Sequence, residues 1–155
     1  MEPINSNHAR HRARISAMQS LYQWQMTQDS PAVIRDQFIA EQDFSRTDVA
    51  YFEELLLTIP TLLAELDAIL LRYTDRGIEE VDPIERAVLR LATYELVHHI
   101  ELPYPVVISE AVGLSKNFGA NEAYKYVNGI LDKVAGEVRK LEVEAAHAVK
   151  KDGTA

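Results

Sequence analysis

The stretch that decides the fold class is ARHRARISAMQSLYQWQMT, residues 9–27. Its apolar residues recur at steps of three and four, which predicts one long helix. On a helical wheel the polar side chains fill only a narrow wedge. We therefore expect this helix to be buried on most sides and to be central in the fold.

The same helical spacing continues along the chain, and alternating strand patterns are absent. It predicts further helices over residues 31–41, 48 to about 70, 83–98, 106–118 and 122 to about 135. Pro60 lies inside the third helix and lacks an amide hydrogen, so a kink or break is expected there. We expect an exposed helix over residues 141–149 and disorder over residues 150–155.

This order of elements predicts an all-α fold of two three-helix bundles packed into one compact domain. The N-terminal half covers roughly residues 9–76, the C-terminal half roughly residues 82–135, and residues 136–155 form a C-terminal extension. Asp82, followed by Pro83 and Glu85, is typical of a helix start. Gly119 is expected to end the helix before it, and Asn121 to cap the next one.

Composition excludes several classes of function. The chain has 155 residues, no cysteine and a net charge of −8. Disulfides and thiolate chemistry are therefore excluded, and without a long apolar run or signal core we expect a cytoplasmic protein. No phosphate-binding glycine loop or nucleophile motif is present, and the adjacent His98 and His99 diverge by about 100° on a helix. We expect neither an enzyme nor a cofactor or metal site.

A basic island stands at the start of this acidic chain. Residues 5–28 hold Arg10, Arg12 and Arg14 with no acid, so this window carries +3 and the remaining residues sum to −11. Arginine close to aromatic rings such as Tyr22 is typical of proteins that bind single-stranded nucleic acid, because phosphates take the charge and bases stack on the rings. The alternative is a solvated helix start, and charge alone leaves both open.

Two further groups of residues have a functional and a plain interpretation. Tyr126 can stack a base while Lys125 binds a phosphate, or the pair is a core tyrosine beside a solvated lysine. On the helix over residues 83–98, the polar residues around the apolar stripe suit either a protein interface or a solvated face. Four of them matter below: Glu85, Arg90, Tyr94 and Glu95.

In these motifs and several others, the chain resembles the NusB family of transcription antitermination factors. The resemblance rests on motifs in register over roughly residues 9–135: RHRAR (10–14), QSLYQW (19–24), ERAVLRLATYEL (85–96), PYPVVISEA (103–111), KNFG (116–119) and KYVNGILDK (125–133). It implies binding to the boxA RNA element of ribosomal RNA leader transcripts and a heterodimer with the ribosomal protein NusE. It also implies a complex with other Nus factors and RNA polymerase, and homodimers in some members.

The resemblance carries these roles over residue by residue. The RNA-binding residues it implies are Arg10, His11, Arg12, Arg14, Tyr22, Glu122, Lys125 and Tyr126. The NusE-binding residues it implies are Glu85, Arg90, Tyr94 and Glu95. Two positions depart from the family pattern: His11 stands where arginine is common, and Tyr126 where phenylalanine is common. The acidic Glu122 is expected to oppose phosphate and so to limit affinity.

Three alternatives remain. One is a helical protein-binding scaffold that does not recognise a specific RNA. Another is the RNA-binding domain attached to some ribosomal-RNA methyltransferases, which the lack of a cofactor-binding domain in this sequence disfavours. The third, an enzyme with a carboxylate site, has no motif in its favour.

Overall fold

A computed structural model describes residues 6–153, and the side chains of residues 6–150. Residues 1–5, which include the first residue of the basic window, and residues 154–155 of the expected disordered end lie outside the described residues. The elements in chain order are α1 (Ser6–Thr27), α2 (Pro31–Glu41), α3 (Val49–Thr58), η1 (Ile59–Leu62), α4 (Leu63–Leu71), η2 (Ile78–Glu80), α5 (Pro83–His98), α6 (Tyr104–Phe118), α7 (Ala123–Val138) and α8 (Lys140–Gly153). No strand occurs in this part of the chain, so the all-α prediction is confirmed.

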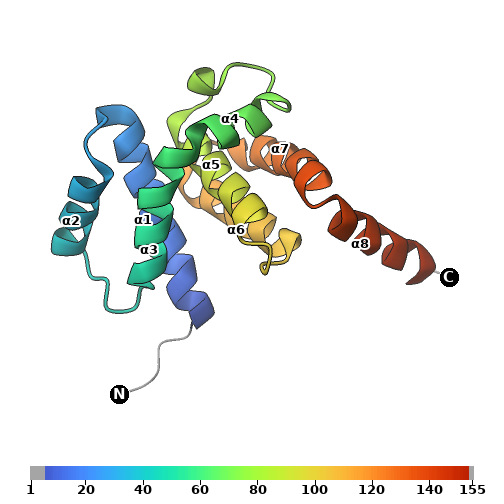
Figure 1. Cartoon of the computed structure of the whole chain (residues 1–155), viewed down its shortest axis with the longest axis horizontal. Helices are drawn as coiled ribbons and strands as arrows, with labels where there is room; N and C mark the ends of the chain where they lie inside the picture. Colours follow the sequence, from blue (N-terminus) through green and yellow to red (C-terminus); the bar gives the residue numbers. More distant parts are fainter. Residues whose placement is uncertain (1–5, 154–155) are drawn as a thin grey trace.

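The predicted break at Pro60 is confirmed. The helix that begins at Val49 ends at Thr58, continues as the short 3-10 turn η1, and resumes as α4. Pro60 cannot donate the hydrogen bond that a straight helix needs at this point. The break lets α3 pack against α1 while α4 packs against α5 (Figure 1).

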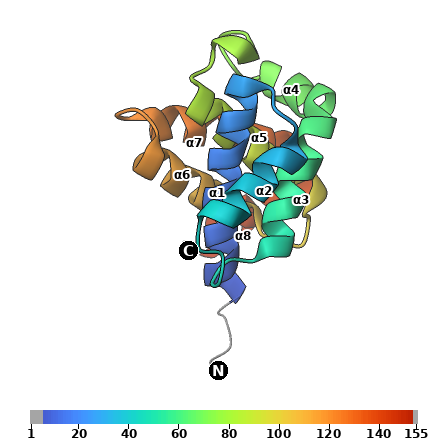
Figure 2. The same ribbon diagram turned by 90° about the vertical axis from the view of Figure 1, so that its left-hand side faces the viewer.

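The central helix is α5 rather than α1, which corrects the prediction. All residues from Glu85 to Leu96 are buried, because α1, α4, α6 and α7 pack around α5. α1 contacts α2, α3 and α5 but loses its cover after Leu21, and Tyr22 and Met26 are exposed. Figure 2 shows α6 and α7 on one side of α1 and α3 on the other, with α2 lying across the front of α1. Charged residues on α5 hid its burial from a hydrophobic pattern, since they are buried as pairs.

Capping predictions are confirmed at one helix and wrong at another. The Asp82 side chain accepts a hydrogen bond from the Ile84 amide at 3.0 Å and caps α5. α7 is preceded by Glu122 in the left-handed conformation (φ 65°), not by an Asn121 cap. Gly119 ends α6 as predicted, but with an ordinary φ of −86°. Glycine fits there because an added Cβ would lie 2.7 Å from the Ser115 carbonyl oxygen.

The C-terminal helix α8 projects away from the other helices (Figure 1). Its first turn is attached to the body, because the Tyr104 amide donates to Glu142 Oε2 at 2.9 Å. Leu141 and Val149 are exposed, as predicted. The helix continues through Gly153, so the disorder expected from residue 150 onward is wrong for residues 150–153.

Candidate RNA-binding and partner-binding surface

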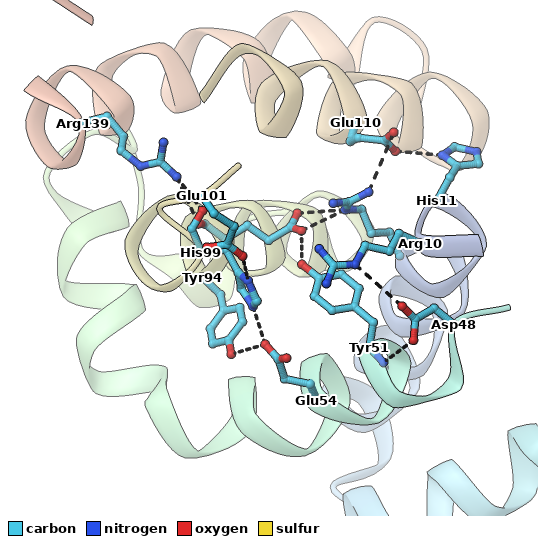
Figure 3. Close-up of polar contacts among 12 residues, drawn as sticks. Arg10, His11, Asp48, Tyr51, Glu54, Tyr94, His99, Glu101, Glu110 and Arg139 are labelled. Carbon is cyan, nitrogen blue, oxygen red and sulfur yellow. Dashed lines mark hydrogen bonds and ion pairs between the residues drawn. The ribbon is translucent and has the colours of Figure 1, made fainter. Parts of the chain in front are cut away.

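Arg10 lies at the edge of a polar cluster between α1 and α3. Its guanidinium lies over the Tyr51 ring, 4.4 Å from the centroid, and its Nε is 3.7 Å from Asp48 Oδ2 (Figure 3). Asp48 also accepts a hydrogen bond from the Tyr51 amide as the cap of α3. Arg10 therefore remains partly exposed, but it must loosen a cation–π contact, worth about 0.5–1 kcal/mol at exposed sites, before it turns to a phosphate.

Arg14 is buried, so it is not available at the surface in this structure, and its role in RNA binding stays a prediction. Its Nε donates to both carboxylate oxygens of Glu95, at 2.9 and 3.2 Å. The Tyr51 hydroxyl donates to the same carboxylate. Burial opposes the charge, but Glu95 outweighs burial and raises the pKa of Arg14, while burial and Glu95 raise the pKa of Tyr51. In this position Arg14 holds α1 against α5.

His11 connects α1 to α6 at the same end of the molecule. Its Nδ1 is 2.8 Å from Glu110 Oε2, and both side chains are partly exposed (Figure 3). Glu110 Oε1 also lies 3.9 Å from Arg14 Nη1. His11 therefore has Glu110 as a competitor for any phosphate, and only Nε2 is left for a ligand.

Arg12 and Tyr22 are the predicted RNA-binding residues that the fold leaves accessible on α1. Arg12 is exposed, and it makes no hydrogen bond or ion pair within residues 6–150. Tyr22 is 39% exposed and borders a hollow of about 190 Å³ that Ile84 and Phe118 also line. The two side chains are ten positions apart, about 15 Å along a rigid helix. We call the α1 surface from Arg12 to Tyr22 the α1 strip.

The predicted residues at the start of α7 are partly occupied. Tyr126 is partly buried, its hydroxyl donates to Asp75 Oδ1 at 3.3 Å, and the Arg76 guanidinium lies 5.2 Å from its ring centroid. Lys125 Nζ donates to Glu122 Oε1 at 3.2 Å. Tyr126 is therefore neither an open stacking platform nor a fully buried core residue, and Glu122 partly neutralises Lys125.

The predicted residues of α1 fall into two groups along the helix. Arg10, His11 and Arg12 lie in the first turns of α1, whereas Tyr22 lies near the junction of α6 and α7 that Phe118 marks. Figure 2 shows α6 and α7 beside α1.

The four residues predicted for partner binding are buried within the chain, so their expected exposure is wrong. Arg90 donates from Nε and Nη2 to Asp67 at 3.0 and 2.9 Å. Tyr94 donates to Glu54 Oε2 at 2.7 Å, and Glu95 holds Arg14 as described above. For Glu85, burial and the nearby Asp82 raise the pKa. Their role in partner binding stays a prediction.

Sequence reasoning missed the polar network that joins α3 to the end of α5. His99 Nδ1 lies 2.6 Å from Glu101 Oε1, and His99 Nε2 contacts Glu54 (Figure 3). Glu54 also receives the Tyr94 hydroxyl. Burial opposes the imidazolium, but the bonds to Glu101 and Glu54 raise the pKa of His99. The sequence gave no signal for this network, since Glu54 lies 45 positions from His99 in the chain.

This network predicts a pH dependence of stability. A His99 pKa above its unfolded value of about 6.5 stabilises the fold below that pH, and the stabilisation is lost as pH rises through the folded-state value. Urea unfolding at about pH 5.5, 7 and 8.5 should show wild-type stability declining toward high pH. His99→Gln should flatten this decline. A decline that is equally steep in His99→Gln contradicts the assignment, and exposed His147→Gln is the matched control.

Two other features, a metal-ion site and a membrane-spanning helix, are absent from the described residues. No group of three or more histidines and acids within them is arranged to hold a metal ion. Nor does any helix there have the length and apolar character to cross a bilayer.

Comparison with known proteins points to one family. The model of the NusB family matches residues 11–136. Transcription antitermination protein NusB of Pasteurella multocida is 50% identical over 126 residues, covering 81% of this chain and 88% of that protein. The protein of the same name in Pseudomonas putida is 47% identical over 136 residues, covering 88% and 82%.

A solved structure of T. maritima NusB has a similar fold. It superimposes with a TM-score of 0.73 at 29% sequence identity, covering 86% of this chain and 96% of that one. The Yersinia pestis protein named transcription antitermination protein NusB is 48% identical over 132 residues, covering 85% of this chain and 96% of that protein. With the family match over most of its length, the chain belongs to the NusB family.

Proposed function

We propose that this protein is a transcription antitermination factor that binds boxA RNA as a heterodimer with NusE and joins other Nus factors on RNA polymerase. The NusB family consists of non-enzymatic transcription regulators, and curated relatives carry the name transcription antitermination protein. The observation that carries the RNA proposal is the α1 strip. Arg12 at one end is exposed and makes no hydrogen bond or ion pair within the described side chains, and Tyr22 is exposed at the other. An exposed cation and an exposed ring on one rigid helix suit single-stranded RNA.

The remaining predicted contacts take secondary places. Arg10, His11 and Lys125 each have an acidic partner in the chain, and RNA phosphates must compete with it. Tyr126 keeps one ring face under Arg76. Free protein should therefore bind RNA weakly, and NusE should raise the affinity by adding surface. The coupling must be reciprocal, so RNA should raise the affinity for NusE by the same factor.

The negative charge outside the basic window supports a second surface, separate from the α1 strip, that binds a protein partner. Outside the basic window the chain carries −11, and the partly exposed Glu54 lies beside α5. Such a surface favours a partner with basic segments, because complementary charge speeds association and fixes orientation. Buried residues of α5 would then position the acid rather than contact NusE, as Tyr94 does through its hydrogen bond to Glu54.

Binding of labelled RNA, measured by fluorescence anisotropy, tests the proposal. The titration compares boxA with a scrambled RNA of equal length, with and without NusE. Tighter binding to boxA that NusE strengthens supports an antitermination factor. Equal, weak binding to both RNAs, unchanged by NusE, would contradict it and favour a helical protein-binding scaffold.

Arg12→Ala should weaken boxA binding by about fivefold to tenfold, because one phosphate contact of roughly 1 kcal/mol is lost. The slope of log affinity against log salt should fall by about 0.7. The melting temperature should change little, since Arg12 makes no hydrogen bond or ion pair among the described residues and acts on the exposed Asp43 only through its charge. Arg72→Ala, which removes an exposed arginine paired with Glu137 at the end of α4, is the matched control. Unchanged affinity in Arg12→Ala would remove Arg12 from the interface.

A further inference from the structure

A second charged site lies where α1, α4 and α5 meet. A pocket of about 170 Å³ is lined by Trp24, Gln25, Gln28, Leu63, Glu79, Arg86 and Arg90. Trp24 follows Tyr22 by two positions, so on a helix its side chain points about 160° away from that of Tyr22. The pocket therefore opens on a different side of α1 from the α1 strip.

Two buried arginines form the polar wall of the pocket. The Arg90 guanidinium is fully engaged, since it donates to both oxygens of Asp67 and, from Nη1, to Gln25 Oε1 at 3.0 Å. The Arg86 side chain is equally buried, but it has a single acidic partner, Glu79, 2.5 Å from its Nη1. Arg86 Nε is buried without any hydrogen-bond partner. An unsatisfied buried donor of this kind destabilises the site and favours a ligand that can accept its hydrogen bond.

Glu79 occupies the mouth of this pocket as a surface residue. Its side chain is 78% exposed, and it comes from η2, a turn of three residues. Glu79 Oε1 is 3.6 Å from Arg90 Nη2, outside hydrogen-bond distance. Arginine binds a carboxylate best through two parallel bonds, and Glu79 makes only one to Arg86. Glu79 therefore fills the pocket with only one hydrogen bond to Arg86, and its carboxylate stays accessible to solvent.

The charges of the two arginines and their acidic partners favour a ligand with a single negative charge. With Glu79 in place, the two arginines are matched by Asp67 and Glu79; with Glu79 withdrawn, the site keeps one uncompensated positive charge. A single carboxylate restores neutrality, whereas a phosphate dianion would leave excess negative charge beside Asp67. Leu63 and the Trp24 ring add apolar walls that suit the flanking side chains of a peptide.

We propose that this Trp24–Arg86 pocket binds an acidic side chain of a protein partner, which displaces Glu79 and forms the two-bond pair with Arg86 that Glu79 leaves incomplete. Glu79 then acts as an internal competitor, and the apparent affinity for the partner is reduced by the fraction of time that Glu79 occupies the site. The inference is independent of RNA binding on the α1 strip.

Trp24 is the single tryptophan of the chain, so its fluorescence reports directly on the pocket. The probe is acetyl-Leu-Glu-Leu-amide, titrated against the full chain, with acetyl-Leu-Gln-Leu-amide and inorganic phosphate as separate arms. Glu79→Gln should bind the Glu peptide at least about fivefold more tightly than wild type, because the competing charge is gone. Glu80→Gln, the neighbouring exposed acid, should bind like wild type.

Arg86→Gln should lose the fluorescence response, and circular dichroism shows whether this variant keeps its helices. If it does not fold, the comparison of Glu79→Gln with Glu80→Gln decides alone. Equal affinity of wild type and Glu79→Gln, or equal response to the Glu and Gln peptides, would overturn the proposal. Tighter binding of phosphate than of the Glu peptide would overturn it in favour of a nucleic-acid site. boxA binding by Glu79→Gln should stay unchanged, so failure here is distinguishable from failure of the RNA proposal.

Discussion

Arg14→Met should lower the free energy of unfolding by about 3–5 kcal/mol, the cost of leaving a buried charge without its partner. Arg14 is 3% exposed and Glu95 is 1% exposed. Removing the guanidinium leaves the Glu95 carboxylate buried with the Tyr51 hydroxyl as its remaining side-chain donor. At about 2–4 °C per kcal/mol for a chain of this size, thermal melting should fall by roughly 10 °C.

Arg12→Met is the matched control for this variant. It removes an arginine from the same helix, two positions away, with no hydrogen bond or ion pair among the described residues, and should change stability by less than about 0.5 kcal/mol. The double variant Arg14→Met with Glu95→Leu should recover much of the loss, because it removes both charges. A melting curve of Arg14→Met within a few degrees of wild type contradicts the buried pair.

This prediction changes how RNA-binding data on the basic motif should be interpreted. Arg10, Arg12 and Arg14 look equivalent in the sequence, yet of the three only Arg12 makes no hydrogen bond or ion pair in the described structure. Loss of boxA binding in an Arg14 variant would follow from loss of the fold, so it cannot identify a phosphate contact. At Arg12 and Tyr22 a substitution can change the affinity for boxA RNA without changing the stability of the fold.

The helices themselves were predictable, because apolar spacing, prolines and caps are local signals. The break at Pro60 and the start of α5 at Asp82 followed from one residue's backbone chemistry. The central position of α5 did not follow. Three of its polar residues, Arg90, Tyr94 and Glu95, are buried with partners that come from other helices: Asp67, Glu54 and Arg14.

The candidate site was predictable only as a set of residues. Family motifs pointed to Arg10–Arg14 and to the start of α7, but a helical wheel cannot separate Arg12 from Arg14 without knowing where α5 lies. The partners that quench the other cations, Asp48, Glu110 and Glu122, lie on three different segments. Which charge is available to RNA is therefore a property of the tertiary fold.

Arg139→Met should have the second largest effect, a loss of about 2–4 kcal/mol, because several hydrogen bonds to one charged group are removed together. Arg139 is 6% exposed, and its guanidinium donates to the carbonyl oxygens of Leu96, Leu102 and His99, at 2.7, 2.8 and 2.9 Å. These carbonyls belong to the end of α5 and the turn after it, where helix carbonyls lack partners and favour a cation. Arg139 also donates to Glu142 at 2.6 Å, which ties the start of α8 to the same point.

Lys140→Met is the control, since Lys140 is the next residue, is exposed, and has no hydrogen bond or ion pair within the described side chains. Hydrogen exchange distinguishes a local from a global effect: Arg139→Met should speed exchange of amides in residues 99–104 and in α8 more than in α1. The α1 strip lies on α1, away from the bonds of Arg139, so boxA affinity measured well below the melting temperature should stay near wild type. Equal protection in both variants would mean that the carbonyls of the α5 end find other donors, and that the C-terminal helix is held by something other than Arg139.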